Sequence, residues 1–344
     1  MDQPPVDNQS EFEVHPQMLL DKDGEKMAAI VKATFLLPPG GGPLEIADEH
    51  ERRLIRAADV PWGEPEKSSV AYPSDICLRK PGTDVVVVAR AFPPGGAPSP
   101  MWDAGVQVGA LRKLVRVFGL RVWESGGSGI SAPRPIESVE IRYDYAWGGS
   151  DGEGPDFIEE ARNPVGMGVA RDTSKLTHQR APHLEDPVHP LHSCTTRPPP
   201  AGLGPTGRHW EPRRRYAGTY DAAWLKFRNP LPPDDFDDRH NLCASPGLLA
   251  EAPLVGGEPV ALSNLVPGGG LTRFDLPRTG VDIEFHVKNR APAVFQPYLD
   301  TVIIDALDIG PEEPLAVELV WRASVKAPRR MKDMRIVVRE REMS

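Results

Sequence analysis

The sequence has few cysteines and no excess of positive charge. Cys77, Cys194 and Cys243 are the only cysteines among 344 residues, which excludes a dense disulfide framework and favours a reducing, cytoplasmic setting. The 40 Lys and Arg residues are outnumbered by 49 Asp and Glu residues, so the net charge is −9. Because nucleic-acid binding depends on neutralising phosphates, this balance argues against a nucleic-acid partner.

Long apolar segments are also missing. The longest uninterrupted apolar run, Val85 to Ala89, is far shorter than the ~20 residues that cross a bilayer, so no membrane partner is expected. The first residues, Met1 to Asp7, have neither a basic start nor an apolar stretch. No secretory signal is therefore expected there.

Proline and glycine are abundant instead. The 39 prolines and 32 glycines interrupt every stretch that would be long enough for an extended helix. The pattern therefore favours short strands that are joined by ordered turns and loops.

Apolar patterns predict strands toward both ends of the chain. In the N-terminal part they are predicted at 27–37, 44–46, 85–92, within 106–123 and at 139–145. In the C-terminal part they are predicted at 258–265, 271–276, 281–287, 299–306, 315–325 and 334–339. The segment 85–92 is apolar at nearly every position, which is typical of a central strand covered on both faces.

Residues 148–218 show no periodicity, and only short helices at 220–227 and 236–242 are expected nearby. The fold class is therefore predicted to be mainly β, with an antiparallel β-sandwich-like core, two β-rich halves, long ordered central loops and a few short helices. The predicted division is an N-terminal half at 1–147, a loop-rich region at 148–230 and a C-terminal half at 231–344. One continuous domain over 14–326 fits the same pattern.

Two glycine motifs resemble catalytic or cofactor-binding signatures. Gly148–Gly152 matches G-x-S-x-G, yet no helix follows Ser150 to support an oxyanion. Gly202–Gly207 matches G-x-G-x-x-G, yet Pro198–Pro200 stand where a strand is required. Both motifs are interpreted as turns, so no catalytic residue and no cofactor are predicted.

Histidines gather in the central region beside one cysteine. His178, His183, His189, His192 and Cys194 are zinc-binding residue types, but their spacing matches no standard ligand pattern. A solvated loop is the simpler interpretation, and no metal ligand is predicted. The alternative hypothesis is a β-rich metal-dependent hydrolase or carbohydrate-active enzyme that uses this loop.

A series of short motifs runs along almost the whole chain. They are Val31–Phe35, Ser74–Asp75, Lys80–Val85, Tyr145–Gly149, Asn163–Gly166, Leu184–Pro187, Tyr216–Asp221 with Trp224, Leu231–Pro232 with Asp235–Asp237, Gly256–Glu258, Leu299–Val302 and Leu319–Ala323. In this order they resemble a bacterial family catalogued as the domain of unknown function DUF2169, over about Val14 to Lys326.

The resemblance implies a role in the type VI secretion system. Members of that family are encoded beside secreted effectors and act as adaptors or chaperones. A similar protein would bind an effector toxin, through its delivery region or a PAAR-type tip domain, and help to load it onto the VgrG spike. The expected protein is bacterial, cytoplasmic and not an enzyme.

Large aromatic and arginine side chains in the central loops are the expected anchors for such a partner, because these residue types dominate interface hot spots. The predicted partner-binding residues are Trp147, Trp210, Arg213, Arg214, Arg215, Tyr216, Tyr220 and Trp224. Trp147 and Trp224 also fit a second interpretation, in which they fill the β core.

Overall fold

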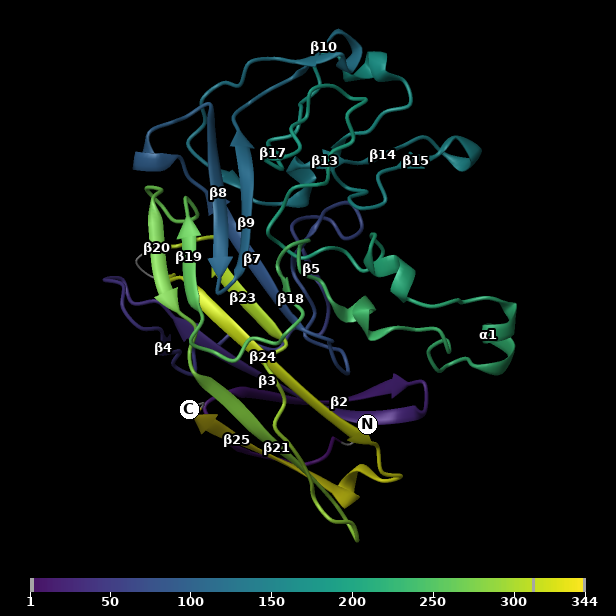
Figure 1. Cartoon of the computed structure of the whole chain (residues 1–344). Helices are drawn as coiled ribbons and strands as arrows, with labels where there is room; N and C mark the ends of the chain where they lie inside the picture. Colours follow the sequence, from purple (N-terminus) through teal and green to yellow (C-terminus); the bar gives the residue numbers. More distant parts are fainter. Residues whose placement is uncertain (1–2, 311–312, 343–344) are drawn as a thin grey trace.

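The computed structural model describes residues 3–310 and 313–342, and it is built mainly from β-strands (Figure 1). Among these residues α1, Ala222–Phe227, is the one α-helix, and none of their helices is long and apolar enough to cross a bilayer. The other helical turns are 3₁₀ turns: η1 Pro94–Gly96, η2 Ser125–Gly127, η3 Tyr143–Tyr145, η4 Gly154–Asp156, η5 Thr173–Leu176, η6 Arg213–Tyr216, η7 Asp238–Asn241 and η8 Met331–Asp333.

An eight-stranded sheet forms the largest layer, in the order β12-β7-β23-β24-β3-β2, with β18 beside β7 and β4 beside β3. Its strands are β2 Glu13–Asp21, β3 Gly24–Leu36, β4 Glu45–Ile46, β7 Thr83–Ala91, β12 Val139–Glu140, β18 Leu249–Ala250, β23 Thr301–Ala306 and β24 Ala316–Lys326. β7 runs parallel to β23, while β24 is antiparallel to both β23 and β3. Strands from both β-rich halves therefore share one sheet.

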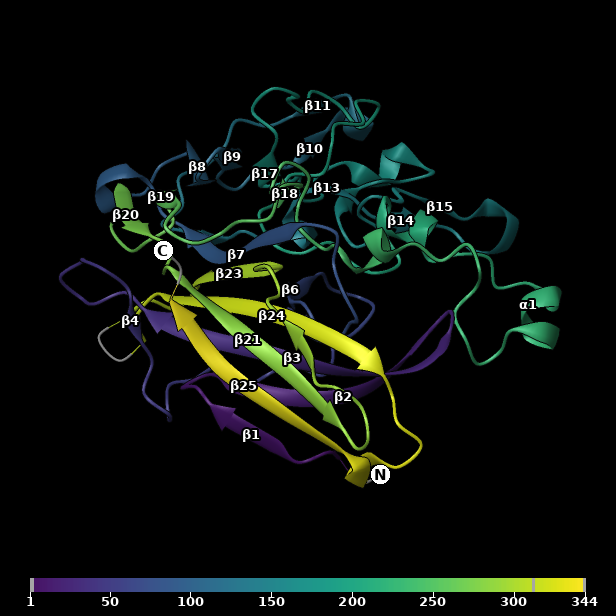
Figure 2. The same cartoon turned by 60° about the horizontal axis from the view of Figure 1, so that its bottom comes forward.

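Two smaller sheets cover one face of the large sheet (Figure 2). The five-stranded sheet has the order β17-β9-β8-β19-β20, and the four-stranded sheet has the order β1-β25-β21-β22. Their strands are β8 Met101–Val108, β9 Leu111–Phe118, β17 Leu184–Glu185, β19 Pro259–Ser263, β20 Leu271–Asp275, β1 Val6–Gln9, β21 Thr279–Val287, β22 Ala293–Phe295 and β25 Met334–Glu342.

One hydrophobic core lies between these layers. Val31 and Val87 from the large sheet share it with Val106 of β8 and Phe285 of β21, and all four are buried. This arrangement confirms the predicted sandwich-like core. Four two-stranded ribbons decorate it: β5 Val60–Pro61 with β6 Val70–Tyr72, β10 Trp123–Glu124 with β11 Gly129–Ile130, β13 Trp147–Gly148 with β16 Met167–Gly168, and β14 Ser150–Asp151 with β15 Ile158–Glu159.

The strand predicted at 139–145 is wrong beyond Glu140. After β12 the chain turns through η3, where the amide of Ala146 donates to the carbonyl of Tyr143. Tyr143 enters the core, while Asp144 accepts a hydrogen bond from the Ser69 hydroxyl on another loop. The alternation of polar and apolar residues in this segment therefore reflects separate tertiary contacts.

The second face of the eight-stranded sheet carries charged side chains. Asp84 of β7, Thr301 of β23 and Lys32 of β3 lie in one line across the sheet, with β24 between the last two. Glu318 and Arg322 project from β24 on the same face. All five are buried, and burial of this kind is costly unless each charge is paired.

The first part of this buried network joins β3 and β24 to Arg56 and Asp75, which lie on the segments that precede β5 and β7. Lys32 Nζ lies 2.5 Å from Asp75 Oδ2 and 2.9 Å from Glu318 Oε2. Arg56 donates to both carboxylate oxygens of Glu318, at 2.5 and 2.6 Å. Burial alone would raise the pKa of the Glu318 carboxyl, but Lys32 and Arg56 outweigh it and hold that pKa below its ordinary value.

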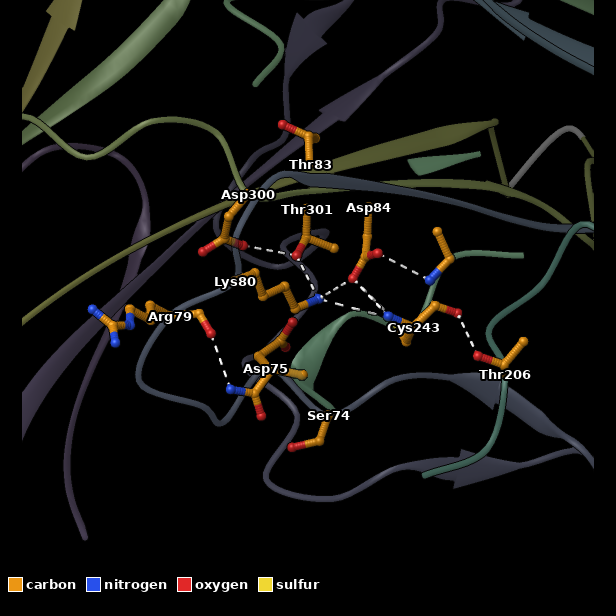
Figure 3. A network of polar contacts seen from close by, with 12 residues as sticks. Ser74, Asp75, Arg79, Lys80, Thr83, Asp84, Thr206, Cys243, Asp300 and Thr301 are labelled. Carbon is orange, nitrogen blue, oxygen red and sulfur yellow. Dashed lines mark hydrogen bonds and ion pairs between the residues drawn. The ribbon is translucent and has the colours of Figure 1, made fainter. Parts of the chain in front are cut away.

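The second part joins β7 and β23 to a distant loop (Figure 3). Lys80 Nζ donates to Asp84 Oδ2 at 2.7 Å and to Thr301 Oγ1 at 2.9 Å. Asp84 also accepts the backbone amides of Cys243 and Ala244, each at 2.9 Å. Burial would raise the pKa of Asp84, and Lys80 with these amides lowers it instead.

The two parts meet at Asp75 and Asp300. Arg322 donates through Nε to the backbone oxygen of Asp75 at 2.9 Å and pairs through Nη1 with Asp300. Asp300 also accepts the hydroxyl of Thr301 at 2.8 Å. The complete network balances four cations against four carboxylates: Lys32, Arg56, Lys80 and Arg322 with Asp75, Asp84, Asp300 and Glu318.

Replacing Glu318 by Gln should strongly destabilise the fold. The change leaves Lys32 and Arg56 without their shared anion, and breaking a buried pair in this way costs about 3–5 kcal/mol. Urea unfolding followed by circular dichroism measures the loss. Glu64→Gln is the control, because the Glu64–Lys67 pair is exposed and is worth at most ~1 kcal/mol. Equal losses in the two variants would contradict this account of the network.

The network should also make the protein sensitive to acid. Unfolded Glu and Asp titrate near 4.5 and 3.8, and the folded pKa values of Glu318 and Asp84 lie below these. The two carboxylates therefore contribute fully to the free energy of unfolding at a pH above their unfolded pKa values. This contribution is lost as the pH falls through those values toward the folded pKa values. The unfolding free energy, measured between about pH 6 and pH 3, should fall more steeply for the wild type than for Glu318→Gln. Parallel curves would show that Glu318 binds no additional proton on unfolding.

Candidate partner-binding surface

Two of the predicted anchors, Trp147 and Trp210, are core residues. Trp147 is 3% exposed and packs with Trp123 and Leu176 in a small hydrophobic cluster under the central loops. Trp210 is buried in the main core, where its ring meets Tyr143 edge to face at 5.5 Å. Neither tryptophan presents a surface to a partner, and the core-filling interpretation applies to Trp147.

The three consecutive arginines have different environments because they lie on the tight 3₁₀ turn η6, which sends neighbouring side chains in different directions. Arg213 is buried and donates to the backbone oxygens of Thr206 and His240, at 2.5 and 3.0 Å. It therefore ties two loop segments together instead of contacting solvent. Arg214 and Arg215 are exposed and pair with Glu159 and Glu211, at 3.1 and 2.8 Å.

The remaining predicted aromatics lie at a segment that projects from the body of the molecule, here called the arm (residues 218–235), which carries α1 (Figure 1). Tyr216 lies at its base, where the Arg239 guanidinium stacks over the ring at 4.2 Å. Tyr220 and Trp224 contact each other on the arm, with 4.7 Å between ring centroids. The structure thus brings Tyr216, Tyr220 and Trp224 to one region.

Hydrogen bonds within the arm fix its shape. Asp235 accepts the amide and the hydroxyl of Thr219, at 2.9 and 2.7 Å, and so closes the base. Gly218 has φ +85, and a Cβ there would come within 2.9 Å of Asp235 Oδ1, so the closure requires glycine. At the tip, Asp221 caps α1 by accepting the Trp224 amide at 2.8 Å, and Trp224 Nε1 donates to the Leu231 carbonyl at 2.9 Å.

The arm exposes large apolar side chains, of which only Tyr220 is among the residues predicted from the sequence, while Leu225 and Phe227 are not. Tyr220, Leu225 and Phe227 are 57%, 62% and 73% exposed. The short predicted helix at 220–227 could have pointed to these residues. A helix of two turns between prolines is too short to bury apolar side chains on every side. A cluster of this kind marks an interaction site more often than an isolated exposed leucine does.

A second apolar projection lies on the same side of the molecule in Figures 1 and 2, at the β14–β15 hairpin. Phe157 and Ile158 are 49% and 37% exposed there. The Glu159–Arg214 pair connects this hairpin to η6, which leads into the arm. Together, Phe157, Ile158, Tyr220, Leu225 and Phe227 are called the projecting surface below.

The histidine-rich loop is divided among separate contacts. His183 is buried and donates from Nδ1 to the Phe118 carbonyl at 2.9 Å, and burial lowers its pKa. His189 lies 3.4 Å from Asp186. Across the part of the chain that the structure describes, no three His, Cys, Asp or Glu side chains converge as a metal-binding group.

A family model described as an uncharacterized protein conserved in bacteria matches residues 22–322. No curated protein and no solved structure shows a significant match.

Replacing Asp235 by Ala should loosen the arm without unfolding the body. The change removes both acceptors that close the base, so amides of residues 219–231 should exchange with deuterium faster, while strands β3, β7 and β24 keep their protection. Hydrogen exchange with mass spectrometry resolves the two regions. Asp234→Ala is the matched control, since the Asp234 side chain is 81% exposed and pairs with Arg228 instead of Thr219. Unchanged exchange in Asp235→Ala would mean that other contacts close the arm.

Proposed function

Because the chain belongs to the DUF2169 family of uncharacterized bacterial proteins, we propose that it is a non-catalytic adaptor or chaperone for a type VI secretion effector. The adaptor binds an effector toxin in the cytoplasm, through the delivery region or a PAAR-type tip domain of the toxin. It then promotes loading of the toxin onto the VgrG spike.

The projecting surface is the observation that carries this proposal. Leu225 and Phe227 lie more than half exposed on a short helix that extends away from the sandwich. Fully burying one such side chain contributes about 1.5–3 kcal/mol, so a partner that covers both gains substantial affinity. The arm and the hairpin together favour a partner with a complementary apolar surface.

The order of the arm supports the same function. Ordering a loop and its side chains on binding costs affinity, and a loop that is already held in shape avoids much of that cost. The Thr219–Asp235 bonds and the Asp221 cap fix the backbone before any partner arrives. The arm therefore presents its apolar residues in a defined geometry.

Co-expression with the product of the neighbouring effector gene tests the function. Size-exclusion chromatography with light scattering should give one discrete complex of the two chains, and this complex should bind purified VgrG. An effector that is stable alone and elutes separately from the wild-type chain would contradict the adaptor function.

Substituting the arm residues tests the location of the surface. Leu225→Asp with Phe227→Asp should weaken effector binding at least about thirtyfold, the loss typical of a hot spot, and leave the melting temperature of the adaptor unchanged. Val255→Asp is the matched control, because Val255 is 61% exposed at a different loop. If the arm variant binds the effector as tightly as this control does, the effector contacts another surface. Formation of the wild-type complex would then still support the adaptor function.

A further inference from the structure

A groove of about 550 Å³ opens beside β9. Its walls combine apolar groups, including several prolines, with a few charged side chains. The lining residues are Arg112, Lys113, Leu114, Tyr143, Arg162, Asp186, Pro187, Val188, Pro199, Pro200, Ala201, Thr206, Glu211, Pro212, Pro246 and Gly247. A concave apolar site with few convergent polar groups is the usual form of a ligand site.

Lys113 occupies an unusual position in this groove. On β9 the residues Leu111, Val115 and Val117 point toward the core, and Lys113 shares their side of the strand. Strand alternation therefore predicts an apolar residue at 113. A cation at such a position costs stability unless another group compensates it.

Lys113 is half-buried, and it differs from the two buried lysines, Lys32 and Lys80, in having no carboxylate partner among the described residues. Lys32 and Lys80 each lie within 3 Å of a carboxylate oxygen. Lys113 Nζ instead donates to the Ser245 hydroxyl at 2.5 Å and to the Pro246 carbonyl at 2.8 Å, and no described carboxylate lies within 4 Å of it. Burial lowers the pKa of Lys113 to about 8, and the more distant Asp186 only partly offsets this.

Two cations that line the groove, Lys113 and Arg112, have no carboxylate partner among the described residues, and the lining Asp186 lies against His189 at 3.4 Å. An ammonium group has three N–H donors, and Lys113 uses two of them on Ser245 and Pro246. Arg112 is exposed and forms no ion pair with any described residue. The other lining Arg and Glu are already paired, Arg162 with Glu160 at 2.7 Å and Glu211 with Arg215 at 2.8 Å.

We propose that this groove binds an extended peptide segment of a partner protein, with an Asp or Glu carboxylate of the segment completing the ion pair of Lys113. Arg112 contacts the same carboxylate from the rim. The proline-rich walls, with Leu114 and Tyr143, receive the apolar residues that flank the acidic one. Charge complementarity selects the anion, and the groove volume fits several residues rather than one small ion.

This site goes beyond the proposed adaptor function and is separate from the projecting surface. None of the five residues of the projecting surface lines the groove. The two proposals can therefore fail independently. The arm variant can lose effector binding while the groove still binds its peptide, and the groove can fail to bind its peptide while the arm still binds the effector.

Fluorescence anisotropy with two labelled, capped pentapeptides tests the proposal on the full chain. The peptides are Pro-Leu-Glu-Leu-Pro and its counterpart with Gln in place of Glu. The wild type should bind the Glu peptide at least about tenfold more tightly, as expected for one charge-assisted hydrogen-bonded contact. Lys113→Met should reduce binding of the Glu peptide to the level of the Gln peptide, and Lys113→Arg should retain the preference.

Controls separate a specific site from a loss of folding. Lys113→Met places an apolar residue where the strand pattern expects one, so its melting temperature should equal or exceed that of the wild type. Lys226→Met, on the exposed arm, should leave peptide binding unchanged. Equal binding of the two peptides, or no binding of either, would overturn the proposal. Hexanoate is the competitor for a small ligand. If it displaces the labelled Glu peptide as effectively as the unlabelled Glu peptide does, the occupant is a small carboxylate and the peptide proposal is overturned.

Discussion

The positions of the loops against the large sheet depend on buried charges, each of which must be paired. Lys32, Asp84, Glu318 and Arg322 lie on three strands of the large sheet, β3, β7 and β24. Their partners lie on loops that come from distant parts of the sequence. An apolar patch could hold a loop in several positions, whereas a carboxylate buried against two amides and an ammonium accepts only one. We therefore interpret the network as a device that selects one loop arrangement, at some cost in stability compared with an apolar core.

This selection reaches the arm through a short chain of contacts. Asp84 holds the amide of Cys243, the Cys243 carbonyl accepts the amide of Thr206 at 2.8 Å, and the Thr206 carbonyl accepts Arg213. Arg213 in turn joins the two segments from which the arm extends. The sheet thus sets the direction of the arm, while the Thr219–Asp235 closure sets its internal shape.

The sequence predicted the fold better than the site. Strand alternation and the apolar run at 85–92 predicted most of the long strands, because these patterns are local, but β2, whose residues are mostly only half-buried, was not predicted. The sequence did not reveal the network, since Lys32 and Glu318 look like ordinary surface charges until tertiary pairing brings them together. Composition also could not separate Arg213 from Arg214, because burial depends on how η6 is turned. Lys113 did leave a local signal, a charge within the apolar series of β9.

The pairing of strands from opposite ends has a consequence for synthesis on the ribosome. β3 and β7 emerge early, yet their neighbours β24 and β23 come from the last part of the chain. At ordinary elongation rates this delay is on the order of ten seconds or more. During that time the nascent chain exposes two apolar strand edges, with Lys32 and Asp84 still unpaired. We therefore expect these two edges to be the places where the nascent chain is most open to mispairing until translation is nearly finished.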